Sequence, residues 1–274
     1  MRRGLVLLFA LLAASVAVAA IVVWLVAPGG TAKRQTGHAR LIGFTLRSDL
    51  LRRSLPQVAV EPPGGGKGRP LLVLLHGRGA LPDSFLSDAF FDAVESLGDR
   101  APGILLANGG DSSYWHDRRD GRWGSYVLRE AIPAAIQLLH SDRKRVAIGG
   151  ISMGGFGALN LARIAPERFC AVGGHSAALW VRAAETPAGA FDDAQDFARN
   201  DVIRFARARS PYRTPVWIDV GTDDPFRSAD GLLAQELRAQ GAPLVFHVWP
   251  GGHEASYWDA HMSSYLRFYA DACR

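Results

Sequence analysis

Short apolar runs alternate with amphipathic stretches through most of this chain. The apolar runs lie at 69–75, 103–107, 169–176, 215–221 and 244–249, with one more directly before Ser152. The run at 69–75 is apolar on both faces, and the run at 103–107 reads as a second buried strand, as in strands that helices cover from both sides. The stretches at 83–97, 127–140 and 228–240 have helical character. Strands that alternate with helices in this way predict an α/β fold with a mostly parallel central sheet flanked by helices.

Three segments depart from this alternation. Residues 41–60 predict two strands joined near Arg52 and Arg53, ahead of the first buried strand. Residues 177–213 interrupt the rhythm with a Pro- and Gly-containing stretch and polar helical segments, which predicts a small cap insertion over the strand ends. The amphipathic stretch at 257–272 predicts a closing helix.

The N-terminus predicts a membrane segment. Two arginines, Arg2 and Arg3, precede a run at 4–27 that holds no charged residue. About 20 apolar residues can cross a bilayer, and basic residues tend to stay on the cytoplasmic side. We therefore expect an anchor in residues 1–30, a polar linker at 31–40, and a catalytic domain at 41–274 outside the membrane. The alternative is a secreted protein whose signal is cleaved after the small-residue pattern at 17–19.

Composition narrows the possible partners. The chain has 274 residues, of which 48% are hydrophobic, enough for one large domain. The net charge of +5 comes from basic residues scattered along the chain, and no motif indicates nucleic-acid binding. The two cysteines, Cys170 and Cys273, have no metal-site spacing. Because one lies in an apolar run and the other is next to last, we expect free thiols; the alternative is a disulfide, which an exported domain could form.

A G-x-S-x-G motif at 150–154 carries the candidate chemistry. It joins an apolar run to a small-residue helix, which is the context of a nucleophile elbow. The flanking glycines are needed because a Cβ there would collide with the neighbouring strand and helix. A serine that only caps the helix is the alternative interpretation. A catalytic serine would also need a base, oriented in turn by a carboxylate.

Both partners follow Ser152 in the chain, each in a loop after a predicted strand. His253 comes after the last strand, and Asp223 and Asp224 come after the strand at 215–221. The order serine, aspartate, histidine is that of α/β-hydrolases. We prefer Asp224 because it stands three residues after the strand-ending Gly221.

The same reasoning predicts an oxyanion hole and a substrate pocket. One donor is the backbone N–H of Met153, and a second is that of Gly77 or Arg78 in the loop after an earlier strand. Tyr114 and Trp115 in a polar, aromatic loop, together with His175 at a strand end, are candidates for lining the pocket. An alternative of equal weight is that the aromatic residues only pack the cap onto the sheet.

The sequence resembles the esterase D and antigen 85 branch of the α/β-hydrolases, which includes S-formylglutathione hydrolases and feruloyl esterases. The resemblance runs from about residue 41 to the C-terminus and is carried by the motifs at 74–79, 130–133, 149–155, 221–226 and 251–254. It implies that Ser152, Asp224 and His253 form a triad. The implied activity is ester hydrolysis or acyl transfer without a cofactor or metal.

Three functions follow from these observations. The first is a serine hydrolase that cleaves carboxylic esters, a small molecule or a lipid, through an acyl-enzyme. The second is an acyltransferase that acts on cell-envelope sugars. The sequence does not separate it from the first, because the two activities share the acyl-enzyme and differ only in whether water or an alcohol accepts the acyl group. The third is a non-catalytic, hydrolase-like binding protein of the cell surface, against which the complete triad argues.

Overall fold

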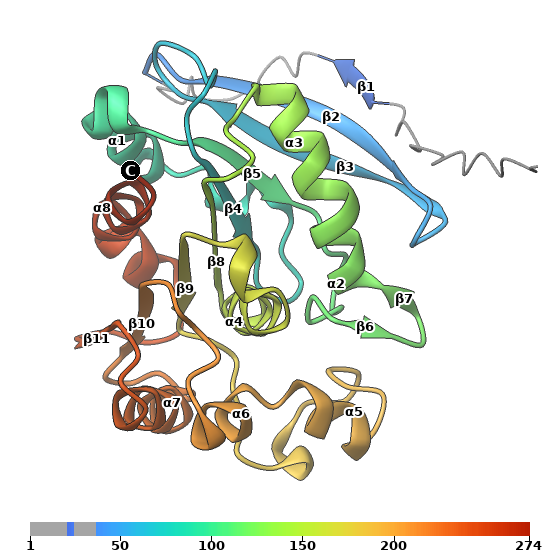
Figure 1. Ribbon diagram of the computed structural model, residues 1–274, viewed down its shortest axis with the longest axis vertical. Helices are drawn as coiled ribbons and strands as arrows, with labels where there is room; N and C mark the ends of the chain where they lie inside the picture. The colour runs from blue at the N-terminus through green and yellow to red at the C-terminus, as the bar shows by residue number, and fades with distance from the viewer. Residues whose placement is uncertain (1–20, 25–36) are drawn as a thin grey trace, which may run out of the picture.

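A nine-stranded sheet forms the centre of the computed structural model, which describes residues 21–24 and 37–274 (Figure 1). In spatial order the strands are β1 (Ile21–Trp24), β2 (Arg40–Ser48), β3 (Arg53–Glu61), β5 (Gly103–Ala107), β4 (Leu71–Leu75), β8 (Val146–Ile151), β9 (Ala171–His175), β10 (Val216–Gly221) and β11 (Leu244–Trp249). The pairings from β1 to β5 are antiparallel, and those from β5 to β11 are parallel. The predicted α/β-hydrolase architecture, a mostly parallel sheet flanked by helices, is confirmed.

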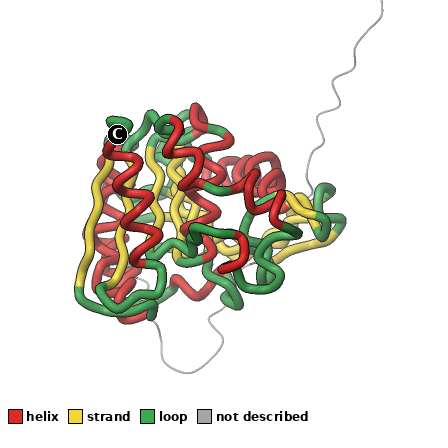
Figure 2. The backbone as a smooth tube through the Cα atoms, turned by 90° about the horizontal axis from the view of Figure 1, so that it is seen from below, coloured by secondary structure: helices red, strands yellow, loops and turns green. Residues whose placement is uncertain are grey.

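Helices pack against the strands (Figure 2). They are α1 (Asp88–Leu97), α2 (Trp123–Tyr126), α3 (Ile132–Leu139), α4 (Met153–Ile164), α5 (Ala194–Asn200), α6 (Val202–Ala208), α7 (Arg227–Ala239) and α8 (Ala255–Ala272), with a π-helical turn at Val127–Ala131 that joins α2 to α3. Short 3-10 turns lie at Pro82–Phe85, Gly98–Arg100, Pro166–Arg168 and Ala183–Glu185. A two-stranded hairpin, β6 (Asp117–Arg118) and β7 (Gly121–Arg122), precedes α2.

Two apolar cores lie on opposite faces of the sheet. Alternate residues of β4 divide between them, because Leu71 and Val73 belong to the core under α3, α4 and α7, whereas Leu72 belongs to the core under α1 and α8. Both faces of the central strands are thus covered, as the continuous apolar runs predict. The sheet edge at the carboxyl ends of its parallel strands is therefore the place where loops can meet and form a site.

The cap predicted at 177–213 lies between β9 and β10 and contains α5 and α6. A buried pair attaches it to the loop after β5, because His116 Nε2 lies 3.0 Å from Asp196 Oδ2 and both side chains are only 1% exposed. Burial on its own would raise the pKa of Asp196, but the hydrogen bonds from His116 and from the Asp192 N–H lower it to about 2. The cap is thus held by a buried hydrogen-bonded pair.

The N-terminal prediction is wrong for four residues. Ile21–Trp24 form β1, which pairs antiparallel with residues 43–46 of β2 and is not part of a helix. Three β-branched residues and a tryptophan favour a strand, and the edge of β2 offers unpaired backbone groups. The other residues of the predicted anchor and most of the linker lie outside the described residues. No helix within the described ranges has the length and apolar character to span a membrane.

The prediction of free thiols is also wrong. Cys170 and Cys273 form a disulfide, with their Cα atoms 5.3 Å apart. The first directly precedes β9 and the second follows α8. Because α8 runs back across the sheet, its end reaches the start of β9, a proximity that their separation of 103 residues conceals in the sequence.

Candidate active site

Ser152 occupies a sharp turn between β8 and α4. Its φ of 57° and ψ of −118° are rarely adopted by residues with a side chain, as a nucleophile elbow requires. A Cβ on Gly154 would strike the carbonyl group of Leu75, and one on Gly150 would strike Gly154 itself. The Ser152 N–H also donates to the His175 carbonyl oxygen at 3.0 Å. The two glycines and this bond hold the serine at the carboxyl end of β8.

A chain of hydrogen bonds joins the three predicted triad residues. His253 Nε2 lies 2.9 Å from Ser152 Oγ, and His253 Nδ1 lies 2.9 Å from Asp224 Oδ2. With Nδ1 protonated, the ring donates to the carboxylate and Nε2 is free to accept the serine proton. The residues come from loops after β8, β10 and β11, which are brought together at one edge of the sheet. This is the geometry of a serine nucleophile with its general base and orienting acid.

Asp224 rather than Asp223 contacts the histidine. The Asp224 side chain is completely buried, and its Oδ1 accepts the Phe226 N–H at 2.8 Å. Burial on its own would raise the pKa of Asp224, but hydrogen bonds from His253, the Phe226 N–H and the Ser176 hydroxyl lower it below its ordinary value. Asp223 is exposed and accepts the hydroxyl of its neighbour Thr222. Only Asp224 can therefore orient the base in this arrangement.

Aromatic edges fix the plane of the His253 ring. Phe226 and Trp258 approach it in T-shaped contacts, with ring centroids at 5.2 and 5.1 Å. The histidine side chain remains 25% exposed. A substrate can therefore reach the base, while the two aromatic rings restrict its rotation.

The loop after β4 lies against the nucleophile. A Cβ built on Gly77 would lie 3.5 Å from Ser152 Cβ and 4.0 Å from Ser152 Oγ. His76 orders this loop: its Nδ1 donates to the Gly77 carbonyl oxygen at 2.8 Å, and its Nε2 accepts the Gly109 N–H at 3.1 Å. Burial lowers the pKa of His76, which favours the neutral ring that these two bonds need.

The backbone amides of this loop divide into two groups. Gly79 N–H donates to the Asp111 carbonyl oxygen at 2.8 Å, and Ala80 N–H donates to the Gly77 carbonyl oxygen at 3.2 Å. The amides of Gly77 and Arg78 remain as candidates for the oxyanion hole. Met153 opens α4, and the first amides of a helix have no acceptor within it. The predicted donors therefore lie on the two segments that flank Ser152.

One of the predicted pocket residues, Tyr114, lies in an aromatic cluster with Trp180 and Phe191 of the cap. The ring centroid of Tyr114 is 5.7 Å from that of Trp180, which in turn lies 5.5 Å from Phe226. Trp115 is completely buried, and its Nε1 donates to the His76 carbonyl oxygen at 3.2 Å. Trp115 therefore supports the loop after β4 from behind, and Trp180, which is partly exposed, is the better candidate for contacting a substrate.

His175 does not face the site. Its ring is buried on the side of α8, with Nδ1 2.7 Å from Asp219 Oδ1 and Nε2 2.9 Å from the Tyr269 hydroxyl. Asp219 also accepts hydrogen bonds from Trp217, Tyr257 and Tyr265. We therefore assign His175 no substrate contact. Its proximity to a strand end suggested the pocket, but the pleat directs its side chain to the opposite face.

The sequence model of the Esterase family, described as "Putative esterase", matches residues 53–269. The chain belongs to this family of α/β-hydrolases. Solved structures with the same fold include a ferulic acid esterase, with 23% identity, a TM-score of 0.73, and coverage of 86% of this chain and 98% of that one. An S-formylglutathione hydrolase from Agrobacterium tumefaciens matches with 17% identity, a TM-score of 0.74, and coverage of 86% and 96%. MPT51 of Mycobacterium tuberculosis matches with 18% identity, a TM-score of 0.65, and coverage of 83% and 96%.

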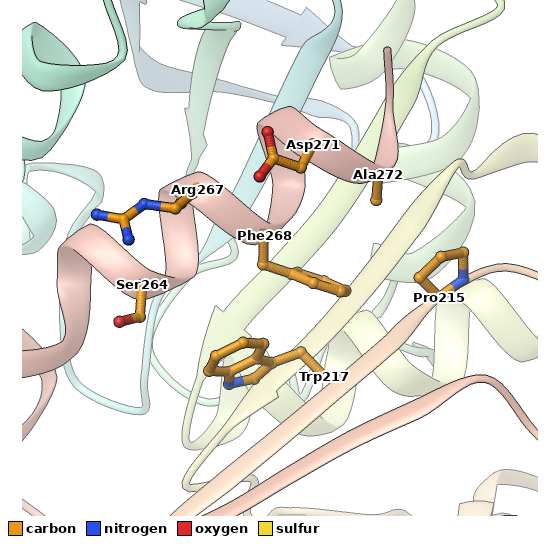
Figure 3. A pocket seen from close by; sticks show the side chains of 7 residues that line it. All are labelled: Pro215, Trp217, Ser264, Arg267, Phe268, Asp271 and Ala272. Carbon is orange, nitrogen blue, oxygen red and sulfur yellow. The ribbon is translucent and has the colours of Figure 1, made fainter.

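A hollow of about 430 Å³ in this esterase-family protein lies between α8 and the start of β10 (Figure 3). Its walls are formed by Pro215, Trp217, Ser264, Arg267, Phe268, Asp271 and Ala272. Trp217 lies near the start of β10, whereas Asp224 follows the end of that strand. The candidate active site is thus identified by its hydrogen bonds and not by the volume of a cavity. No group of His, Cys, Asp and Glu side chains suited to a metal ion occurs in the part of the chain that the structure describes.

The sequence analysis did not identify Ser176, which interacts with Asp224. Ser176 directly follows β9, is completely buried, and shares its position at the sheet edge with the triad loops. The available signal was its place after a strand that neighbours the elbow strand. A lone serine in a Gly- and Ala-rich stretch is too common for that signal to stand out.

Proposed function

We propose that this esterase-family protein hydrolyses carboxylic esters with Ser152 as nucleophile, His253 as general base and acid, and Asp224 as the orienting carboxylate. The observation that carries the proposal is the continuous hydrogen-bond chain from Asp224 through His253 to Ser152, with 2.9 Å at each step. The strained serine backbone and the adjacent amide-bearing loop support it.

The reaction follows from the positions of these groups. His253 Nε2 takes the proton of Ser152 as its oxygen bonds to the ester carbonyl carbon, and the backbone amides of Met153 and of Gly77 or Arg78 stabilise the oxyanion. When the C–O bond to the alcohol breaks, His253 returns the proton to the leaving oxygen. Water, deprotonated by the same histidine, then attacks the acyl-serine. His253 gives this proton to Ser152 Oγ as the bond between that oxygen and the acyl carbon breaks and the acid leaves. Loss of one oxyanion donor typically lowers turnover by roughly 10²–10³.

Hydrolysis of p-nitrophenyl butyrate, together with labelling by a fluorophosphonate probe, tests this proposal. We expect turnover by the wild-type protein and loss of both signals in Ser152→Ala. The exposed Ser96, whose hydroxyl bonds only to its own helix at Ala93, provides a matched control as Ser96→Ala. Absence of turnover and of labelling in the wild-type protein would refute the esterase proposal. Adding a sugar acceptor distinguishes acyl transfer from hydrolysis, because transfer gives an acylated sugar as well as free acid.

We also propose that the domain functions on the outer side of a membrane, anchored by its N-terminal apolar run. The uncharged residues that precede β1, at 4–20, and the disulfide between Cys170 and Cys273 support export, because a run of about this length can cross a bilayer and disulfides persist in oxidising compartments. Protease treatment of intact cells should digest the domain while the anchor remains with the membrane. Mass spectrometry of the mature N-terminus would show cleavage after residue 19 if the run is instead a signal peptide.

A further inference from the structure

Ser176 lies between the acid of the triad and a tryptophan of α8. Its side chain is completely buried, and Trp258 Nε1–H donates a hydrogen bond to Ser176 Oγ at 3.2 Å. The same tryptophan contacts the His253 ring by its edge. Ser176 therefore lies within a buried network that reaches both the acid and the base.

The hydrogen bond from Trp258 to Ser176 Oγ determines the direction in which the serine hydroxyl proton points. A hydroxyl oxygen that accepts one hydrogen bond still has its own proton to donate, and an indole N–H can act only as donor. A side-chain hydrogen bond from Ser176 is one of the interactions that lower the pKa of the Asp224 carboxyl, so this carboxylate is the acceptor of the serine proton. Trp258 thus turns the hydroxyl of Ser176 toward Asp224.

The backbone holds Ser176 in this place at an energetic cost. Its φ is 48°, in the left-handed region that residues with a side chain seldom adopt. Such a conformation is unfavourable for a residue with a side chain and persists only where neighbouring contacts enforce it. The Ser176 N–H donates to the Asp219 carbonyl oxygen at 2.8 Å, and two residues later the Ala178 N–H donates to the Ser152 carbonyl oxygen at 2.9 Å. The segment is therefore tied directly to the nucleophile elbow.

We propose that Ser176 is a positioning residue, aligned by Trp258, that fixes the Asp224 carboxylate for its hydrogen bond to His253. This inference rests on the proposed esterase function. It adds a donor to the acid that the triad itself does not contain: Asp224 then receives the Phe226 N–H, the His253 ring N–H and the Ser176 hydroxyl.

The charges around Asp224 determine the direction of the effect. From α7, Asp230 faces the same region, but burial and the nearby carboxylates of Asp224 and Asp219 raise its pKa well above the usual range, so that it is neutral. From α8, Tyr257 also feels the Asp224 charge, but burial and the nearby carboxylates of Asp219 and Asp224 raise its pKa, so that it is neutral too. His253 is the titratable group that forms a hydrogen bond with Asp224. Without the Ser176 hydroxyl, the negative charge of Asp224 is shared among fewer donors and acts more strongly on the imidazolium. The protonated form of His253 is then favoured in the variant.

A double-mutant cycle with Ser176→Ala and Trp258→Phe tests the proposal, with Ser263→Ala on the exposed side of α8 as control. For Ser176→Ala we expect kcat to fall about three- to tenfold with KM within about twofold, and the acidic limb of the kcat/KM profile to move to higher pH by about half a unit. Trp258→Phe retains the ring edge but loses the N–H, so it should change both parameters in the same direction by less. In the Ser176→Ala background it should add nothing.

The proton resonance of His253 Nδ1–H provides a readout that does not depend on turnover. Its chemical shift should change in Ser176→Ala and stay unchanged in Ser263→Ala. An unchanged resonance and pH profile in Ser176→Ala, or an equal effect of Trp258→Phe with and without the serine hydroxyl, would overturn the positioning role. If the wild-type protein hydrolyses no ester, the esterase proposal fails, and the resonance still tests Ser176. Should Ser176→Ala not fold, Trp258→Phe alone must shift the resonance for the proposal to stand.

Discussion

Removing the disulfide between Cys170 and Cys273 should lower the stability of the domain substantially. The bond closes a long loop, because the two cysteines are 103 residues apart in the sequence. On the loop-entropy account, a crosslink of this length stabilises the fold by about 4.7 kcal/mol, and measured values for native disulfides commonly fall between about 2 and 5 kcal/mol. For a domain of this size each kcal/mol corresponds to roughly 2–4 °C in Tm. We therefore expect the Cys170→Ala/Cys273→Ala variant to melt roughly 9–19 °C below the wild-type protein.

The assay is denaturant unfolding followed by far-UV circular dichroism, with and without dithiothreitol. The reductant should destabilise the wild-type protein by about the same amount as the double substitution and should leave the double variant unchanged. Because α8 follows His253 and ends at this crosslink, heating should abolish ester hydrolysis at a lower temperature in the variant. A loss of less than about 1 kcal/mol, or free thiols in the unfolded, unreduced wild-type protein, would refute the reasoning.

The remaining predictions concern the acid, the cap and the pocket. Asp224→Asn should lower kcat by roughly 10⁴-fold because the amide no longer fixes the required histidine tautomer, whereas Asp223→Asn should retain activity within about twofold; a larger loss at Asp223 in ester hydrolysis would reverse the assignment. The folded-state pKa of Asp196, about 2, lies below its ordinary value of 3.8. The pair with His116 therefore contributes about 2 kcal/mol to the free energy of unfolding above about pH 4, and this contribution is lost as the pH falls toward 2. Urea unfolding of Asp196→Asn should lack this pH dependence. Trp180→Ala should move the preferred p-nitrophenyl ester toward longer acyl chains, since Trp180 lines the small space under the cap with Phe156 and Phe191; an unchanged chain-length profile would remove Trp180 from the pocket.

The sequence predicts the sheet and the triad for the same physical reason. Runs such as 71–75 and 146–151 are apolar at every position because helices cover both faces of these strands, and residues that follow such runs must meet at one edge. Ser152, Asp224 and His253 are polar residues in those places, so their meeting could be anticipated. Asp224 could be preferred to Asp223 from its spacing after Gly221 alone.

The errors come from contacts that no local pattern encodes. Pairing of Cys170 with Cys273 depends on the path of α8 across the sheet, which hydrophobic periodicity does not determine. His175 was assigned to the pocket because it ends a strand, yet the strand pleat directs it toward Asp219. Residues 21–24 are as apolar as a membrane helix, and the partner that makes them a strand is the edge of β2.

The hydrogen bonds to the Asp219 carboxylate restrict how the sequence of this protein can change in evolution. Four side chains donate to it, from His175, Trp217, Tyr257 and Tyr265, and together they join β9, β10 and α8. Replacing Asp219 alone would leave several buried donors without an acceptor, and replacing one donor would weaken the solvation of a buried acid. Any single substitution in this set is therefore destabilising, even if replacing all of its members with apolar residues would give a stable cluster. The set should therefore be inherited as a unit, and descendants that have lost it should have changed several of its members together.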